Sequence, residues 1–400
     1  MVNFIVKYKL LFLLLSLFIA MLLFGNLVPI TAKSFFYAVS LSIKNIIVFL
    51  LPLVIFTFLW GSLVALQKRA GKFILLLLIL VSFSNFIAIL AGYEIGIYLL
   101  PIIKFNLAMV DSNLQLHPAW NLVLPQIIST KNAIIISIIL GLFFAFKPNP
   151  YISRIAQIMN DSVIYFLRHY FTPILPLFIL GFLFKLEHEK VLSQLIAAYG
   201  MIFLLVVCAQ ALYTVVLYFL AAGFKFRKLW EYMRNMMPAS ITAFSTVSSA
   251  ATMPITLVCT EKNLKDNKMF ARTIIPATCN IHTIGSSIGV TILALATLKA
   301  FGLPLPDLKN FLTFAIYCTL AKYAVAGVPG GVVIVVAPLL EIYLGFTSEM
   351  VGIVTALYLL FDPCGTATNV TCNGAFALIF DKIYHAELIK KFFINPFKSR

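Results

Sequence analysis

Uninterrupted apolar runs recur along this 400-residue chain, and they restrict its possible folds more than any other feature. Two examples are LLFLLLSLFIAMLLF at residues 10–24 and FILLLLILVSF at residues 73–83. Because the bilayer core offers no water to backbone groups, only helices and closed barrels cross it. Polar residues do not alternate with the apolar ones, and this continuous pattern indicates helices rather than barrel strands. We therefore expect an all-α polytopic membrane protein.

The composition agrees with a membrane protein, since 62% of the residues are hydrophobic and 11% are charged. Soluble domains have about 45–50% apolar and about 25% charged residues. A helical span needs about 20 apolar residues. The first run lacks a small-residue cleavage site, so we interpret it as a retained span rather than a signal peptide. We predict eight spans, near residues 9–30, 41–66, 73–103, 132–147, 163–185, 191–223, 269–300 and 350–380.

The net charge of +16 is gathered in basic clusters between apolar runs. These clusters lie near residues 68–72, 225–234, 262–272 and 382–400. Basic clusters between spans are typical of cytoplasmic loops. We therefore predict an inner-membrane protein with both termini cytoplasmic, in contact with membrane lipid and without a nucleic-acid partner. The six cysteines lie in or beside apolar runs without metal-ligand spacing, which indicates packing residues.

Two segments of the second half are apolar but rich in small residues. Residues 235–262 include SSAATMP, and residues 309–345 include VAGVPGGVVIVVAP. Each segment precedes a span that contains an asparagine after a small polar residue, in TCNIH and in ATNVT. Such a repeat predicts two re-entrant hairpins, whose tips must be buried in protein or line a cavity. Paired interrupted segments of this kind indicate the binding site of a secondary transporter.

The stretch FDPCGTATNVTCNGAFALIF at residues 361–380 places polar residues inside an apolar run. Positions 362, 366, 369 and 373 are spaced by four, three and four residues, so they share one helix face. An acid inside a span indicates a functional site. A structural alternative is an ion pair of Asp362 with a lysine such as Lys322. Ordinary hydrogen bonding between helices is the alternative for Thr366 and Asn369.

These motifs, in this order, resemble the glutamate-transporter homologues, the dicarboxylate/amino acid:cation symporters. The matching stretches are SSAATMP, TCNIH, AGVPGG and DPCGTATNVTCN. The resemblance implies inverted repeats, a homotrimer, and an elevator-type transporter whose mobile transport domain crosses the membrane against a fixed scaffold. It implies scaffold helices at 1–72 and 132–190, transport-domain segments at 73–131 and 191–385, and a cytoplasmic tail at 386–400.

The resemblance also implies roles for individual residues. Asp362 would hold the α-ammonium group of an amino acid, and Asn369 would bind its α-carboxylate. The other implied substrate-binding residues are Ser248, Ser249, Gly327, Val328, Pro329, Gly330, Gly365 and Thr366. The implied cation-binding residues are Thr278, Asn280, His282, Asn369 and Asn373.

Three positions depart from the family pattern. Gly365 stands where the family has the arginine for acidic substrates, so a side-chain carboxylate loses its bidentate partner there. We therefore expect a small, neutral amino acid. His282 and Asn373 stand where the family has aspartates that bind cations, which leaves Thr278 and Asn280 for one sodium ion. His282 suggests that a proton replaces sodium; the alternative is a neutral histidine that is hydrogen-bonded between helices.

We predict a symporter that imports this amino acid with Na⁺ or H⁺ and uses no other cofactor. A dicarboxylate symporter for glutamate or aspartate, and an uncoupled exchanger or channel on the same scaffold, remain alternatives. A membrane enzyme is disfavoured, because the sequence has no G-x-S-x-G or H-E-x-x-H motif.

Overall fold

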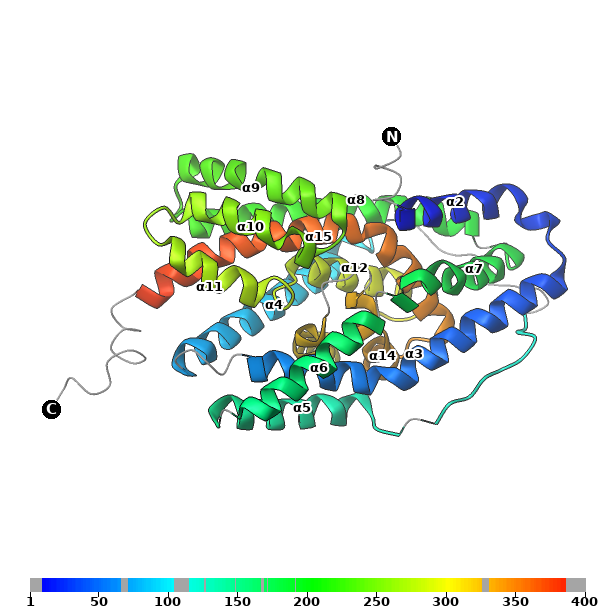
Figure 1. Ribbon diagram of the computed structural model, residues 1–400. Helices are drawn as coiled ribbons and strands as arrows, with labels where there is room; N and C mark the ends of the chain where they lie inside the picture. Colours follow the sequence, from blue (N-terminus) through cyan, green and yellow to red (C-terminus); the bar gives the residue numbers. More distant parts are fainter. Residues whose placement is uncertain are drawn as a thin grey trace.

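The computed structural model describes residues 9–65, 71–103, 115–125, 127–147, 149–166, 169–170, 172–190, 192–325 and 331–385. Within these ranges the chain forms helices and no strand, which confirms the predicted all-α class (Figure 1). The α-helices are α2 (Lys9–Phe24), α3 (Ile30–Ala65), α4 (Gly71–Leu99), α5 (Thr130–Phe146), α6 (Pro150–Phe166), α7 (Thr172–His188), α8 (Leu192–Ala221), α9 (Phe226–Thr246), α10 (Ser249–Asn263), α11 (Lys268–Thr278), α12 (Ile284–Ala300), α13 (Leu308–Ala321), α14 (Gly331–Leu344) and α15 (Ser348–His385). Two short 3₁₀ helices in the same described ranges are η1 (Gly25–Leu27) and η5 (Lys322–Ala324).

Three helices in the described part of the chain are long and apolar enough to cross a membrane. The stretches are Leu75–Leu99 in α4, Gly200–Ala221 in α8, and the whole of α15. The helices α12, α13 and α14 are apolar but shorter. The total of eight spans therefore stays a prediction.

Two predicted spans have different bounds in the structure. The span near 41–66 begins earlier, because α3 starts at Ile30 and includes Lys33 and Lys44. Both lysines are buried and paired with acids, Lys33 with Glu187 and Lys44 with Glu341, so they do not end the helix.

The span predicted at 163–185 is not one helix, since α6 ends at Phe166 and α7 begins at Thr172. Pro173 is the second residue of α7. Proline suits the first turn of a helix, where its missing N–H removes no hydrogen bond. The boundary between α6 and α7 therefore lies inside the predicted span, where the sequence has the polar residues Arg168 and His169.

One group of helices packs around α3, which contacts α5, α6 and α7. Figure 1 shows α5 and α6 lying along α3 at one side of the molecule. Trp60 and Val64 of α3 form a small buried cluster with Ala156 of α6. We call α3, α5, α6 and α7 the α3 group.

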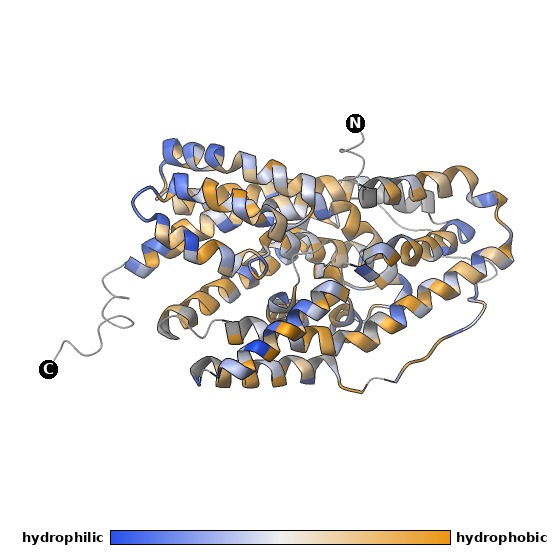
Figure 2. Ribbon diagram, viewed as in Figure 1, coloured by the Kyte–Doolittle hydropathy of each residue, from blue (hydrophilic) through white to orange (hydrophobic). Residues whose placement is uncertain are grey.

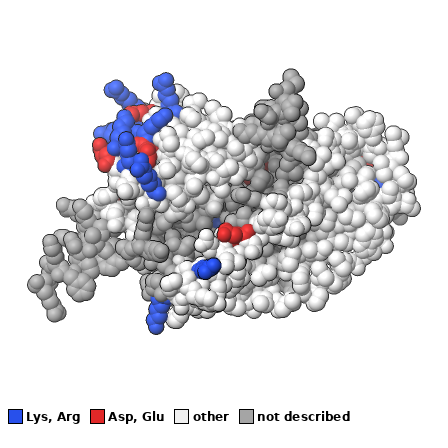
Figure 3. All heavy atoms as spheres, viewed as in Figure 1, with Lys and Arg blue, Asp and Glu red and all other residues white. Residues whose placement is uncertain are grey.

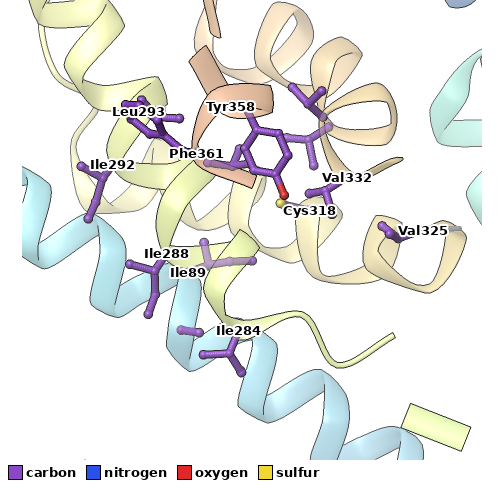
Figure 4. Packing of buried hydrophobic residues seen from close by; sticks show 14 of the residues in the cluster. Ile89, Ile284, Ile288, Ile292, Leu293, Cys318, Val325, Val332, Tyr358 and Phe361 are labelled. Atoms are coloured by element: carbon purple, nitrogen blue, oxygen red, sulfur yellow. The ribbon is translucent and has the colours of Figure 1, made fainter. Parts of the chain in front are cut away.

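A second group packs around α12, which lies near the centre of the molecule and contacts α4, α8 and α15 (Figure 1). Almost every residue of α12 is buried, as expected for a helix that is apolar on all sides. Figure 4 shows Ile284 and Ile288 of α12 beside Ile89 of α4. The same cluster includes Leu293 and Phe361 (Figure 4). We call α4, α8, α12 and α15 the α12 group.

Two helical hairpins and one broken helix pack against the α12 group. Helices α9 and α10 contact each other and meet at Val247, which has a positive φ of 50°. The first hairpin was predicted at 235–262, but α9 already begins at Phe226, since the basic cluster forms its exposed first turns. Helices α13 and α14 form the second pair, separated by η5 and by residues outside the described ranges. Helices α11 and α12 are separated by residues 279–283, where TCNIH predicted an interruption.

Charged side chains gather at one end of the molecule. Figure 3 shows most of the charged groups of this face over the ends of α9, α10 and α11, and Figure 2 shows hydrophilic residues at the same end. The exposed basic residues of these helix ends and turns are Lys225, Arg227, Lys228, Arg234, Lys262, Lys265, Lys268 and Arg272. Two of the predicted basic clusters therefore meet on one surface, the arrangement expected of loops at one side of a membrane.

Candidate functional site

A cleft opens where the interrupted segments meet α15. It has about 310 Å³ of empty volume, part of which is open to solvent. The lining comes from the turn between α9 and α10, the break between α11 and α12, both sides of the second hairpin, and the middle of α15. The lining residues are Val247, Ser249, Cys279, Asn280, Thr283, Ser286, Val325, Gly331, Val332, Asp362, Thr366 and Asn369.

Helix α15 contributes the one acidic side chain among these lining residues, Asp362. Asp362, Thr366 and Asn369 follow each other at intervals of four and three residues, so they lie on the face of α15 that borders the cleft. They are only 5%, 4% and 4% exposed, respectively. The Thr366 hydroxyl donates to Asp362 Oδ1 over 3.4 Å. This face therefore presents a negative charge in a largely desolvated place.

The side chain of Asn369 is held by the first turn of α12. Its Oδ1 accepts from the backbone N–H of Ser286 at 3.2 Å, and its Nδ2 donates to Ser286 Oγ at 2.9 Å. The Tyr358 hydroxyl donates to the same Oγ at 2.8 Å. The ring of Tyr358 lies in the apolar cluster seen in Figure 4. Ser286 therefore fixes the orientation of Asn369, a predicted substrate-binding residue. The sequence analysis did not select Ser286.

Two side-chain oxygens of the cleft have no hydrogen-bond partner among the described residues. They are Asn280 Oδ1 and Thr283 Oγ1, both in the break between α11 and α12. Buried polar atoms are usually satisfied, so an orphaned pair beside an open volume suits a ligand. Thr278, the other predicted sodium ligand, lies away from the lining, and its hydroxyl donates to the Ile274 carbonyl at 2.9 Å.

The two predicted serines of the first hairpin differ in position. Ser249 lines the cleft, whereas the hydroxyl of Ser248 accepts from the Ala251 N–H at 3.2 Å and caps α10. In the second hairpin, the predicted ligands Gly327, Val328, Pro329 and Gly330 lie outside the described residues.

Gly365 does not belong to the cleft lining. A Cβ atom on Gly365 would lie 3.8 Å from the Ser286 nitrogen and 3.9 Å from Gln210 Nε2. Gly365 therefore faces α12 and α8, so a larger residue at this position would first meet these helices.

His282 is fully buried and does not line the cleft. Its Nε2 lies 2.9 Å from Ser84 Oγ of α4, and its Nδ1 lies 3.0 Å from Asn373 Oδ1 of α15. A neutral ring that donates from Nδ1 and accepts at Nε2 satisfies both contacts. The predicted cation ligands therefore separate into Asn280 and Asn369 at the cleft, and His282 and Asn373 behind it.

A comparison with family models matches residues 10–383 to the "Sodium:dicarboxylate symporter family". The chain belongs to this family. The resemblance that the motifs indicated is thus confirmed, and the family consists of transporters rather than enzymes.

Curated relatives of this symporter-family chain have related descriptions. A stretch of 160 residues is 29% identical to "Excitatory amino acid transporter 1" of Ambystoma tigrinum, covering 40% of this chain and 29% of the relative. A stretch of 222 residues is 26% identical to the Rattus norvegicus protein of that description, covering 55% and 40%. A "Putative sodium-dependent excitatory amino acid transporter glt-3" of Caenorhabditis elegans is 27% identical over 205 residues, covering 50% and 37%. The chain thus spans less than half the length of these relatives.

Two further polar residues of this symporter-family member hold the broken helix in place. Asn85 of α4 donates to the Ile281 carbonyl at 2.7 Å and accepts from the Thr283 N–H at 3.0 Å. Gln210 of α8 donates to the Gly285 carbonyl at 2.9 Å. The Asn85 contacts satisfy backbone groups in the break, whereas Gln210 adds a hydrogen bond to a carbonyl in the first turn of α12. Both are polar residues inside apolar runs, the same signal that singled out residues 361–380.

Proposed function

We propose that this chain is a secondary active transporter that moves an α-amino acid across the membrane together with a cation. The carboxylate of Asp362 in the central cleft is the observation that carries the proposal. A desolvated carboxylate suits the α-ammonium group of an amino acid, because each ion compensates the buried charge of the other. Donors for the α-carboxylate come from Asn369 and from nearby groups such as the Ser249 hydroxyl.

The substrate class has two candidates. An acidic amino acid is favoured by the family description and by relatives named for excitatory amino acids. A small, neutral amino acid is favoured by the cleft itself, because no lysine or arginine is among its described lining residues. A second carboxylate buried without a cationic partner would cost free energy. We rank acidic amino acids first, because the family description and the names of the relatives favour them.

The coupling ion is Na⁺ or H⁺. The family description and the name of the Caenorhabditis elegans relative favour sodium. The orphaned Asn280 Oδ1 supplies one hard oxygen ligand at the cleft, and the buried Thr278 lies two residues before it. The replacement of two carboxylates by His282 and Asn373 leaves fewer charged ligands for further sodium ions.

The movement proposed is that of a transport domain against a fixed scaffold. The scaffold comprises residues 1–72 and 132–190, the transport domain 73–131 and 191–385, and the tail 386–400. Packing supports this division. The α3 group belongs to the proposed scaffold, the α12 group belongs to the proposed transport domain, and each group packs around its own central helix. A homotrimer in the inner membrane, with both termini cytoplasmic and lipid around it, completes the proposal; the mass of the detergent-solubilised protein tests the trimer.

Uptake into proteoliposomes tests the function. Labelled L-aspartate, L-glutamate, L-serine and L-alanine are offered under an inward sodium gradient, an inward proton gradient, or neither. Accumulation above the outside concentration under one gradient supports coupled transport and identifies the ion and the substrate class. Equilibration without any dependence on a gradient would instead identify an exchanger or a channel. No movement of any of the four would contradict amino-acid transport.

A substitution in the cleft tests the role of Asp362. Asp362→Asn removes the charge with little change in volume, and we expect at least a 100-fold loss of binding for every amino acid that is transported. Asp381→Asn is the matched control, because Asp381 lies on the same helix and accepts from Asn267 at 2.8 Å, outside the cleft. An Asp362→Asn variant with unchanged affinity would contradict the proposed site.

A further inference from the structure

Lys322 is buried without the partners that the other buried lysines have. Lys33, Lys44 and Lys322 are 5%, 8% and 0% exposed, respectively. Lys33 pairs with Glu187, and Lys44 pairs with Glu341. The Nζ of Lys322 has no hydrogen-bond partner in the described part of the chain. The predicted alternative of a direct pair with Asp362 is therefore not present in this structure.

The backbone around Lys322 is held close to the cleft. Its neighbour Tyr323 donates to the Leu78 carbonyl at 2.8 Å and lies 2.8 Å from Ser82 Oγ, which ties η5 to α4. The carbonyl of Lys322 accepts from the N–H of Val325 at 3.2 Å, and Val325 lines the cleft. The lysine is thus one short turn away from the cleft lining.

Asp362 is the negative charge that acts on Lys322. Helices α3, α13 and α14 pack against η5, and α15 carries Asp362. Among the titratable groups of these elements, Cys318 on α13 and Asp362 on α15 influence the amine electrostatically. A neutral thiol carries no charge, so Asp362 is the one of these two groups that can compensate a protonated Lys322 as an anion. The attraction acts beyond hydrogen-bond distance, through an interior of low dielectric constant.

A bound amino acid would bring a second positive charge to the same carboxylate. This argument rests on the proposed function, in which Asp362 holds the α-ammonium group. One carboxylate compensates one cation well, whereas two cations in a desolvated region repel each other. We propose that Lys322 and the substrate's ammonium group compete for Asp362, so that binding of the substrate releases the proton of Lys322.

The proton transfer balances without any further reactant. One N–H bond of the ammonium breaks, its electron pair stays on Nζ as the neutral amine, and the proton passes to water. When the substrate leaves, water returns a proton to Nζ and the charge of Asp362 is compensated again. Lysine can make this change, whereas arginine stays protonated in proteins.

Thermodynamic linkage makes the effect reciprocal. If bound substrate lowers the proton affinity of Lys322, a proton on Lys322 must lower the substrate affinity by the same factor. A lower pH therefore weakens substrate binding. The proton on Lys322 then moves with the empty carrier, in the direction opposite to the substrate. The chain would thus carry a positive charge of its own beside the cleft.

Calorimetry on the purified full-length protein tests the inference. L-Aspartate and L-serine are titrated in buffers of different ionisation enthalpy, which gives the number of protons released per bound molecule. We expect the wild type to release up to about one proton, and its Kd to rise up to about tenfold per pH unit as the pH falls. Lys322→Met is expected to release none and to bind with a pH-independent Kd.

Two further variants keep the test decisive. Lys322→Arg keeps a permanent charge, so it is expected to bind the probes more weakly and release no proton, and it serves if Lys322→Met does not fold. Lys309→Gln is the matched control, since Lys309 is exposed on α13, and it should release protons as the wild type does. Wild-type binding without proton release, or equal release by Lys322→Met, would overturn the inference. Failure of the wild type to bind either probe would be seen separately and would overturn the proposed function as well.

Discussion

Lys185 Nζ lies 2.6 Å from Glu349 Oε2, and this ion pair joins α7 to the first turn of α15. A second pair joins α3 to α14, where Lys44 Nζ lies 2.5 Å from Glu341 Oε1. Lys44 also donates to the hydroxyl of Ser348, the residue before Glu349, at 2.5 Å. The two lysines therefore connect the α3 group to the helices of the cleft. Any sliding of one group along the other has to break both pairs.

We predict that loss of these two ion pairs speeds transport. In a double variant, Glu341→Gln with Glu349→Gln, the state seen here loses two pairs whose lysines are largely buried, which raises its free energy by at least about 1–2 kcal/mol. If sliding limits the rate, substrate exchange in proteoliposomes should rise at least about fivefold. Glu231→Gln is the control, because its exposed pair with Lys265 joins neighbouring helix ends and not the two groups. Slower or unchanged exchange would argue against sliding at this surface.

We predict that Ser286 stabilises the cleft through Asn369. Ser286→Ala leaves the amide of Asn369 and the hydroxyl of Tyr358 without their shared acceptor, at a cost of about 1–3 kcal/mol. Thermal unfolding in detergent should show a lower Tm, and substrate affinity should fall because the Asn369 side chain is no longer held. Tyr358→Phe removes one of these hydrogen bonds and should have a smaller effect on affinity. An unchanged affinity in Ser286→Ala would mean that Asn369 is positioned by other contacts.

We predict that Gly285 cannot be replaced by alanine without loss of stability. A Cβ atom there would lie 2.4 Å from the Gly365 carbonyl oxygen and 2.6 Å from Thr368 Cβ, so α12 and α15 would have to separate. Overpacking of this kind costs about 1–3 kcal/mol. Gly200→Ala is the control, because nothing lies within 4 Å of its added Cβ. The yield of monodisperse protein after purification separates the two variants, and equal yields would contradict the close approach.

We predict that His282 has a structural role. In a His282→Asn variant, the pH dependence of uptake should stay within about twofold of the wild type, because the buried ring already satisfies Ser84 and Asn373 in its neutral form. Stability should fall by about 1–3 kcal/mol, since two buried groups lose a partner. His385→Asn, at the exposed end of α15, is the control. Loss of the pH dependence in His282→Asn alone would restore the histidine as the proton carrier.

Local patterns were sufficient for the class of fold and for the segments that line the cleft. Continuous apolar runs determined that the chain is helical, because lipid leaves the backbone no other way to satisfy its hydrogen bonds. The spacing of Asp362, Thr366 and Asn369 determined that they share one face of α15, because side chains three and four residues apart are neighbours on a helix. The break at TCNIH was also predictable, since polar and small residues interrupt an apolar run there.

Only the tertiary structure decided which polar groups meet across helices. Ser286 and Asn369 are 83 residues apart in the chain, and Ser84 and His282 are 198 apart. Helical periodicity specifies the face of a residue but not the helix that covers this face. For the same reason, the sequence could not show that Lys33 and Lys44 lie inside a helix with acidic partners, while the amine of Lys322 is buried without a hydrogen-bond partner among the described residues. The cost of burying a charge depends on what packs around it, and packing is decided by the whole fold.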